Sequence, residues 1–158
     1  MKILLLSDSH GSLSTMLSAV KKFGENADII VHCGDAPRGE ALELIKCYSG
    51  KTVVCVRGNC DWGSDFEDIE YFTVCGKKIM VTHGHLFNAK FGLDGLYEKA
   101  VEEDCDMVFF GHTHYPTDTV IGDVRLINPG SCGRYEPSCA TVEIDDKGNV
   151  LVNHLKID

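Results

Sequence analysis

The first part of the chain alternates between short apolar runs and amphipathic stretches. Apolar runs at 3–7, 28–33 and 51–56 have the length and composition of buried strands. Between them, apolar residues recur at helical spacing at 13–23, where Gly24 is predicted as the C′ residue, and again at 41–48. Successive strand–helix–strand units predict a parallel sheet with right-handed crossovers.

The second half of the chain is richer in strands. Segments 71–74 and 78–82 flank Cys75-Gly76-Lys77, which is typical of a hairpin turn. A helical pattern at 93–101 leads into an apolar strand at 107–110, and short strands follow at 118–121, 124–127, 140–144 and 150–155. We therefore expect an α/β protein in which two sheets pack together with helices outside them.

Composition narrows the class of protein without identifying it. The 158 residues predict one domain, 1–158, and no apolar run approaches the roughly 20 residues needed to span a bilayer. The apolar start ends at Ser7-Asp8, too early for a secretion signal, so we expect a cytoplasmic protein that binds no membrane. The net charge of −9, with no Lys/Arg-rich block, argues against a long nucleic-acid footprint.

The eight cysteines give little support to a disulfide framework or a zinc site. None forms a C-x-x-C pair, and several lie in apolar runs, where a reduced thiol behaves as a small hydrophobic side chain. We expect most of them to be core residues in a reducing compartment.

Polar clusters follow the predicted strands at five places. They are Asp8-Ser9-His10-Gly11, Gly34-Asp35, Gly58-Asn59-Cys60-Asp61, Thr82-His83-Gly84-His85 and Gly111-His112-Thr113-His114. Each alone is modest evidence, because a single Asp-x-His is more often a cap or a turn than a metal site. Together they place ligand-capable groups and glycines at five strand ends, which is where open α/β sheets bind ligands.

The donor types in these clusters suit a pair of metal ions. Carboxylate, amide oxygen and imidazole fit Mn, Fe, Co, Ni or Zn better than Mg or Ca, which prefer oxygen-only shells. We expect two divalent ions per chain, with Mn ahead of Ni, Fe, Co and Zn. Two such ions, balanced by Asp8, Asp35 and a hydroxide, would leave a charge of about +1 inside an acidic protein, which suits a phosphate.

These five blocks, in this order, resemble the motifs of the calcineurin-like metallophosphoesterase superfamily. The match spans most of the chain, and the short length, the G-N-C-D block and the turn at 127–131 resemble its small, cap-less bacterial and archaeal phosphodiesterases. The resemblance implies an α/β/β/α sandwich, that is, two mixed sheets flanked by helices. It also implies a first metal ion held by Asp8, His10, Asp35 and His114, and a second held by Asp35, Asn59, His83 and His112.

Two residues of the motifs, His85 and Cys60, are not among the implied metal ligands. Strand parity does not distinguish His83 from His85, and the resemblance selects His83 as the ligand, leaving His85 on the substrate side. Many members of the superfamily have histidine at the position of Cys60, as the group that protonates the leaving oxygen. A packing role is the simpler interpretation of this thiol, and its presence affects the expected substrate range.

The resemblance implies hydrolysis of small phosphate esters by direct attack of a hydroxide that bridges the two ions. Asp35, Asn59 and His85 are the residues expected to be catalytic, and the lack of a cap predicts an open site. The main alternative is an inactive scaffold of the same fold that serves as a protein-interaction subunit, although all seven ligands are intact. A phosphoprotein phosphatase is disfavoured by the absence of a recognition insert, and a homo-oligomer stays open.

Other candidates are weaker. Arg57, Arg125 and Arg134 could contact phosphate, but solvated surface is the simpler expectation for each. We expect His32 to be a strand residue beside the site and His154 to be a surface residue.

Overall fold

The first sheet combines the start and the end of the chain. In a computed structural model that describes residues 1–36, 39–133 and 135–158 (backbone only at 40, 41 and 44), its strand order is β10-β9-β1-β2-β3. The strands are β1 (Lys2–Leu6), β2 (Ile29–His32), β3 (Thr52–Cys55), β9 (Ser138–Ile144) and β10 (Val150–Lys156). β1, β2 and β3 run parallel, and the β9–β10 hairpin is added antiparallel beside β1.

The second sheet is built from the middle of the chain, in the order β4-β5-β6-β8-β7. Its strands are β4 (Ile69–Val74), β5 (Lys77–Thr82), β6 (Met107–Phe109), β7 (Thr117–Ile121) and β8 (Val124–Asn128). β5, β6 and β8 are parallel, and the two edge strands are antiparallel to their neighbours. Both sheets are therefore mixed.

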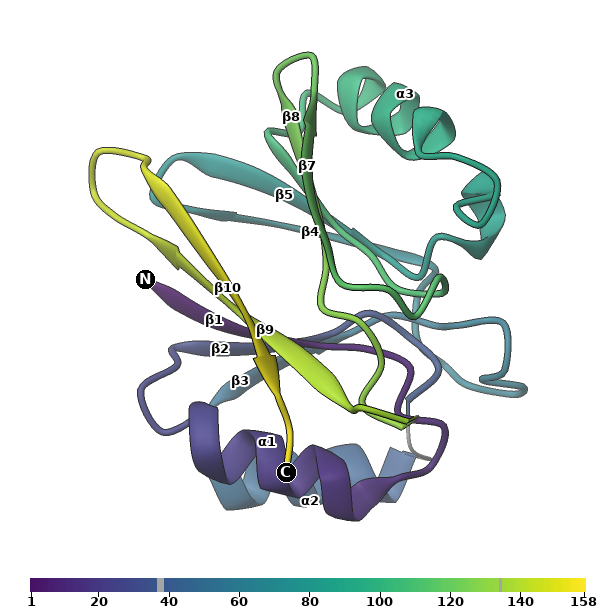
Figure 1. The fold of residues 1–158 in the computed structure, drawn as a ribbon, viewed down its shortest axis with the longest axis vertical. Coiled ribbons are helices and arrows are strands. Elements are labelled where there is room, and N and C mark those ends of the chain that lie inside the picture. The colour runs from purple at the N-terminus through teal and green to yellow at the C-terminus, as the bar shows by residue number, and fades with distance from the viewer. Residues whose placement is uncertain (37–38, 134) are drawn as a thin grey trace.

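Helices cover the outer face of each sheet and complete four layers (Figure 1). Helices α1 (Leu13–Phe23) and α2 (Gly39–Ser49) lie on the first sheet, and α3 (Asp94–Glu102) lies on the second. A short 3-10 helix, η1 (His85–Phe87), follows β5. The predicted α/β/β/α sandwich is confirmed. No helix among the described residues is long and apolar enough to cross a membrane.

Alternating residues of β1 enter different cores, which explains why its sequence is continuously apolar. Ile3 and Leu5 pack between the two sheets, whereas Leu4 and Leu6 pack against α1 and α2. A strand buried on both faces needs apolar side chains at every position. A third core lies between the second sheet and α3 and includes Phe110.

The predicted elements are all present, with ends that differ by one or two residues. The β4–β5 turn contains two residues, Cys75 and Gly76, rather than three, because Lys77 already pairs with Val74. Both turn residues have positive φ, 48° and 74°, as this kind of tight hairpin requires. Gly24 is the C-cap of α1 rather than the predicted C′ residue, and its φ of −85° is right-handed, so this helix end does not use the left-handed conformation that favours glycine at C′.

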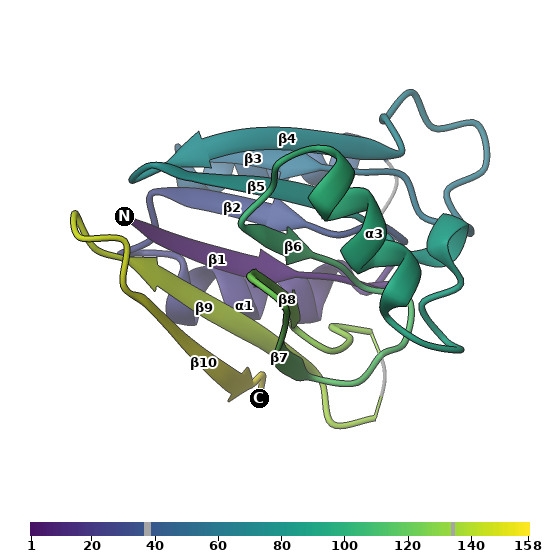
Figure 2. The same cartoon turned by 90° about the horizontal axis from the view of Figure 1, so that it is seen from above.

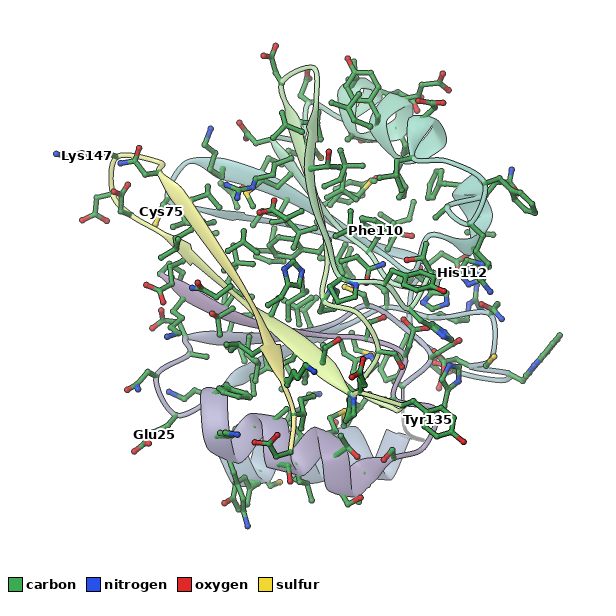
Figure 3. The ribbon with its side chains drawn as sticks, viewed as in Figure 1. Glu25, Cys75, Phe110, His112, Tyr135 and Lys147 are labelled. Atoms are coloured by element: carbon green, nitrogen blue, oxygen red, sulfur yellow. The ribbon has the colours of Figure 1, made fainter. Side chains whose placement is uncertain are left out.

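The parallel strands of both sheets deliver their carboxyl ends to one side of the sandwich. β1, β2 and β6 point the same way in Figure 2. Figure 3 shows His112 on this side, far from Cys75 and Lys147 at the opposite end. The loops that leave these strand ends carry the polar clusters of the sequence.

Candidate metal centre

Seven predicted ligands from five separate loops meet at this end of the sandwich. They are Asp8 and His10 after β1, Asp35 after β2, Asn59 after β3, His83 after β5, and His112 and His114 after β6. Three overlapping groups of side chains have ligand atoms within 4.8 Å of one another: Asp8, His10 and His114; Asp8, Asp35 and His83; and His10, Asp35 and Cys60.

The first group consists of Asp8, His10 and His114, whose ligand atoms all lie within 4.8 Å of one another. Asp8 Oδ1 is 3.0 Å from His114 Nε2, and the two histidine Nε2 atoms are 3.4 Å apart. Asp35 Oδ2 lies 3.9 Å from His10 Nε2 and so borders this group.

The second group is centred on His83, which is completely buried. Its Nε2 lies 3.1 Å from Asn59 Oδ1 and 3.5 Å from Asp35 Oδ2. The ring of His112 is 5.0 Å away, centroid to centroid. His83 Nδ1 lies 2.7 Å from the carbonyl oxygen of Cys33, which leaves Nε2 facing the site.

Asp8 is oriented so that one of its carboxylate oxygens is left free. Ser7 Oγ donates to Asp8 Oδ2 at 2.6 Å, and the His112 N–H donates to the same oxygen at 3.0 Å. Although Asp8 is fully buried, Oδ1 accepts no hydrogen bond within the described part of the chain: His114 Nε2 is 3.0 Å away but is not aligned to donate to it. A buried carboxylate oxygen without a donor is costly unless a cation contacts it, and this one faces the site imidazoles.

The two carboxylate oxygens of Asp35 also have different surroundings. Its Oδ1 accepts the backbone N–H of Cys60 at 2.7 Å. Its Oδ2 lies between His10 and His83, at 3.9 and 3.5 Å. One oxygen thus fixes the carboxylate, and the other lies between the first two groups.

The backbone at the site is strained at five of the seven ligand positions. Asp8, His10, Asp35, His112 and His114 all have φ between 45° and 67°. Conformations of this kind cost about 1–3 kcal/mol each and tend to cluster at functional sites. Hydrogen bonds from Asp8 N to Gly34 O (3.0 Å) and from His10 N to Asp35 O (3.1 Å) hold two of them in place.

Glycines let the loops approach closely. A Cβ at Gly34, whose φ is 90°, would lie 2.9 Å from the backbone nitrogen of Gly58. A Cβ at Gly111 would overlap Ser7 Oγ, and one at Gly58 would overlap Asp35 Oδ1. These two glycines therefore leave room for the carboxylates and their hydrogen bonds.

The electrostatics favour positive charge between the loops. Burial alone would raise the pKa of Asp35, but contact with His83 and the Cys60 N–H outweigh it and lower that pKa well below its usual range. Burial would lower the pKa of His83, yet Asp35 and Asp8 raise it. A proton is thus favoured where a cation would sit.

Other site groups are held in the form that binds metal. Burial raises the pKa of Asp8, but His114 and His83 outweigh that effect and lower it, which keeps the carboxylate ionised. Burial, with the charge of His83, lowers the pKa of His112 to about 4, so its imidazole is neutral at pH 7. Ionised carboxylates and neutral imidazoles are what a metal ion requires of these side chains.

Some supporting residues escaped the sequence analysis. Asp61 Oδ2 accepts the backbone N–H groups of Asp35 (2.8 Å) and Gly58 (2.7 Å), which joins two ligand loops. Asn128 Nδ2 donates to Gly111 O at 2.9 Å. Ser131 Oγ donates to Asp8 O at 2.8 Å. Asp61 and the turn at 127–131 belong to recognisable sequence motifs, but a motif does not show which distant loops its residues contact.

His85 and Cys60 both lie at the edge of the site. The ring of His85 is 5.4 Å from that of His83 and 6.1 Å from that of His112. Its Nδ1 has no hydrogen-bond partner among the described residues, and burial together with the charge of His83 lowers its pKa. Cys60 is exposed, and its Sγ accepts a 3.4 Å hydrogen bond from Asn59 Nδ2.

Two of the arginines that could contact phosphate are paired with carboxylates. Arg57 forms two hydrogen bonds with Asp68, at 2.9 and 2.8 Å, and Arg125 pairs in the same way with Asp118. Arg134 lies outside the described residues.

His32 and His154 match their expected places. His32 is a buried strand residue, and its Nε2 lies 2.9 Å from Ser9 Oγ, directly behind the Asp8 loop. His154 is on the surface. All eight cysteines are free, and four of them are buried.

Comparison with known proteins gives a consistent result. A family model described as the calcineurin-like phosphoesterase superfamily domain matches residues 1–147. The probable metallophosphoesterase YsnB of Bacillus subtilis is 36% identical over 131 residues, covering 83% of this chain and 75% of that protein. The phosphodiesterase MJ0936 of Methanocaldococcus jannaschii is 29% identical over 164 residues, covering 92% and 93%.

Solved structures share the architecture along the whole chain. A predicted phosphoesterase from Streptococcus pneumoniae superposes with a TM-score of 0.76 at 26% identity, covering 98% of this chain and 97% of that one. Vps29 from Entamoeba histolytica superposes with a TM-score of 0.79 over all of both chains, but at 21% identity this likeness shows the fold alone.

Proposed function

Because the chain belongs to the calcineurin-like phosphoesterase superfamily, we propose that it is a phosphodiesterase that hydrolyses small phosphate esters at a centre of two divalent metal ions. One observation carries the proposal: Asp8 Oδ1 is buried without a hydrogen-bond donor and faces the site imidazoles. A phosphodiesterase among the relatives supports the diester over the monoester.

The proposed ligand sets follow the first two groups of side chains. Asp8, His10, Asp35 and His114 would hold the first ion, and Asp35 would share the second with Asn59, His83 and His112. The mixed oxygen and nitrogen donors favour Mn²⁺, with Ni, Fe, Co and Zn behind it. When bound, the ions would supply a bridging hydroxide as the nucleophile, polarise the phosphoryl oxygens and orient the ester.

The chain's own residues prepare this centre before a substrate arrives. Ser7 and the His112 N–H turn Asp8 so that Oδ1 faces the site. The Cys60 N–H donates to Asp35 Oδ1 and so leaves Asp35 Oδ2 facing the site. Asn59 directs its carbonyl oxygen towards His83 and its amide nitrogen towards Cys60, so one side chain meets both the site and its edge.

His85 is placed to act on the substrate rather than on a metal ion. It lies beside the ligand rings, and its lowered pKa keeps the imidazole neutral at pH 7. A neutral imidazole can donate one hydrogen bond and accept another. We assign it to contact with the ester oxygens.

We also propose the cytoplasm as the location of the protein and residues 1–158 as its functional domain. Eight free cysteines suit a reducing compartment. The ligands come from residue 8 to residue 114, and β9 and β10, at the end of the chain, complete the sheet that carries the first of them.

Metal removal and restoration test the enzyme against a scaffold of the same fold. Chelator-treated protein should be inactive towards bis(p-nitrophenyl) phosphate and should recover when Mn²⁺ or Ni²⁺ is restored. His114→Ala should mainly empty the first metal position, and His112→Ala the second, by elemental analysis. Absence of turnover with Mn, Fe, Co, Ni and Zn, despite measured occupancy, would favour the scaffold.

A further inference from the structure

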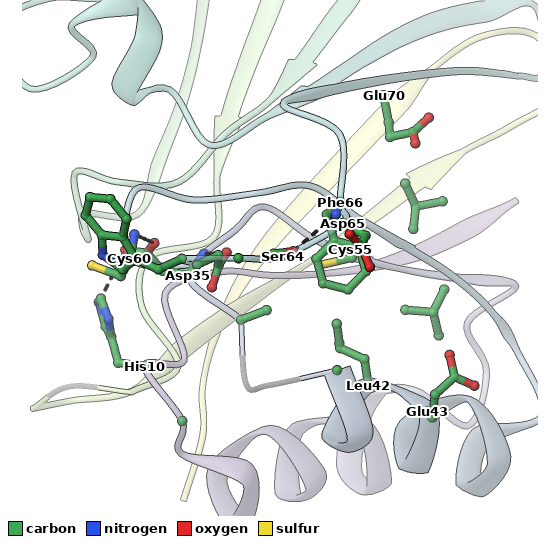
Figure 4. A pocket seen from close by; sticks show the side chains of 18 of the residues that line it. His10, Asp35, Leu42, Glu43, Cys55, Cys60, Ser64, Asp65, Phe66 and Glu70 are labelled. Atoms are coloured by element: carbon green, nitrogen blue, oxygen red, sulfur yellow. Dashed lines mark hydrogen bonds and ion pairs between the residues drawn. The ribbon is translucent and has the colours of Figure 1, made fainter.

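A groove of about 1210 Å³ opens beside the metal centre and runs along α2 and the edge strand β3. His10, Asp35 and Cys60 line one end of it (Figure 4). Glu43 and Glu70 line the other end in the same view. A phosphate at the metal centre could therefore extend one of its alcohols directly into the groove.

The middle of the groove is apolar. Leu42 and Phe66 belong to or pack against the core beneath α2, and Val53 and Cys55 come from β3. Trp62, the only tryptophan in the sequence, also lines the groove with 91% of its surface exposed. A large exposed indole in the lining of this groove offers a surface for a flat apolar group.

Most of the described charged residues that line the groove are carboxylates. Among the described lining residues, Lys46 is the one lysine or arginine, and its Nζ lies 2.9 Å from Glu43 Oε1. Asp65 and Glu70 form no ion pair in the part of the chain that the structure describes. An anionic group in the groove would thus meet carboxylates, and no described lining residue offers it a free cation.

We propose that this groove binds one alcohol arm of the phosphodiester and selects an apolar, uncharged arm of the phenylalkyl kind. The inference rests on the proposed function, which places the phosphate at the metal centre. Continuity with that centre gives the groove its occupant, the apolar floor gives the chemistry of the arm, and the carboxylates of the lining disfavour a negatively charged arm.

Three p-nitrophenyl diesters with the same leaving group test the selection. Their second arms are methyl, 3-phenylpropyl and 3-(4-carboxyphenyl)propyl, and kcat/KM is measured for each with Mn²⁺-loaded protein. An arm that fills an apolar pocket typically gains about 10- to 100-fold, so we expect at least tenfold preference for phenylpropyl over methyl. The carboxylate should reduce the preference by about five- to tenfold, because like charges repel at short range.

Two variants locate the effect in the groove. Trp62→Ala should reduce the phenylpropyl-to-methyl ratio several-fold, whereas Phe91→Ala, a matched aromatic with 92% exposure outside the groove lining, should not. Asp65→Lys should raise kcat/KM for the carboxylate ester relative to the phenylpropyl ester. Asp123→Lys, an exposed carboxylate in the β7–β8 turn, is its control.

Fluorescence of the single tryptophan gives a readout that does not need turnover. Titration with 3-phenylpropyl methylphosphonate should produce a saturable change in Trp62 emission, and methyl methylphosphonate at equal concentration should not. An inactive protein that shows this change would refute the proposed function but keep the groove assignment. Equal emission changes with both probes, or equal kcat/KM for methyl and phenylpropyl esters, would overturn the assignment.

The Trp62→Ala variant would also reveal whether a second copy of the chain occupies the groove. If Trp62→Ala changed the sedimentation coefficient of the protein and left the arm preference intact, the groove would be a contact between copies of the chain, and the proposal would be wrong.

Discussion

Asp61 offers a quantitative test of how the site is held together, because one oxygen of its carboxylate joins two ligand loops. Asp61 Oδ2 accepts the Asp35 N–H at 2.8 Å and the Gly58 N–H at 2.7 Å. Asp61 itself belongs to neither proposed ligand set. Its removal should therefore disturb the loops without removing a donor from the metal centre.

The expected cost follows from the two hydrogen bonds. A hydrogen bond to a charged group contributes about 1.5–3 kcal/mol, and Asp61 is half-buried, so water can replace part of the loss. We expect Asp61→Ala to lower the free energy of unfolding by about 2–4 kcal/mol. Asp61→Asn keeps a carbonyl acceptor and should cost about 1 kcal/mol. For a chain of this length, each kcal/mol lowers Tm by about 2–4 °C.

Urea unfolding of chelator-treated protein measures this cost directly. Asp65→Ala is the matched control, since Asp65 is an exposed carboxylate in the same loop. Metal titration of the folded variants should then show weaker binding for Asp61→Ala than for Asp61→Asn, because the loops of Asp35 and Asn59 are less well fixed. If Asp61→Ala unfolded with the same free energy as wild type, the carboxylate would not be joining the loops and the reasoning would fail.

The other predictions concern the shared carboxylate, the leaving group and pH. Asp35→Asn should abolish hydrolysis and reduce the metal content at both positions, as measured by elemental analysis. The control is Asp104→Asn, which changes an exposed aspartate with a similar φ of 52° and should do neither. Wild-type turnover of Asp35→Asn with two ions bound would contradict the bridging role. Because a neutral thiol is a poor proton donor, we expect Cys60 not to protonate the departing oxygen. Rates over a series of aryl and alkyl diesters should then depend steeply on leaving-group pKa, since a positioned acid typically contributes about 10²–10⁴-fold. A flat series that became steep only in Cys60→Ala would make the thiol the acid, and one that became steep only in His85→Ala would give that role to the histidine. Burial lowers the pKa of His32 from 6.5 to about 4, so between these values the unfolded chain binds the extra proton and stability falls as pH falls. Chelator-treated wild type should therefore lose about 3 kcal/mol more than His32→Gln between pH 7 and pH 4 in urea unfolding, and parallel pH profiles would refute this.

The layers of the fold could be predicted because burial on two faces leaves a clear signal in the sequence. β1 alternates between two cores, so its apolar run is continuous and its strand is evident. The order of the strands left no such signal. β9 pairs with β1 across more than a hundred residues, and the register that joins Leu5 to Ala140 depends on contacts that no local pattern records.

The sequence could predict which side chains meet at the candidate site, but it could predict less of how they are oriented. Asp8 and Asp35 stand out because each follows an apolar strand and lies near a glycine. Ser7 is equally important to the geometry, since it fixes which oxygen of Asp8 faces the site. A serine at the end of a strand has no distinctive pattern, and its role appears only when Gly111 brings the loop after β6 against it.

The residue types at the centre suit the backbone as well as the metal. Five of the proposed ligands have positive φ, a conformation that most side chains avoid but that aspartate and histidine adopt several times more often than other residues. A glycine would adopt the same backbone without strain, yet it would offer no donor. An alanine would offer neither the donor nor the tolerance. Aspartate and histidine meet both requirements at the strand ends, so the same residue types account for the sharp turns and for the proposed ligand set.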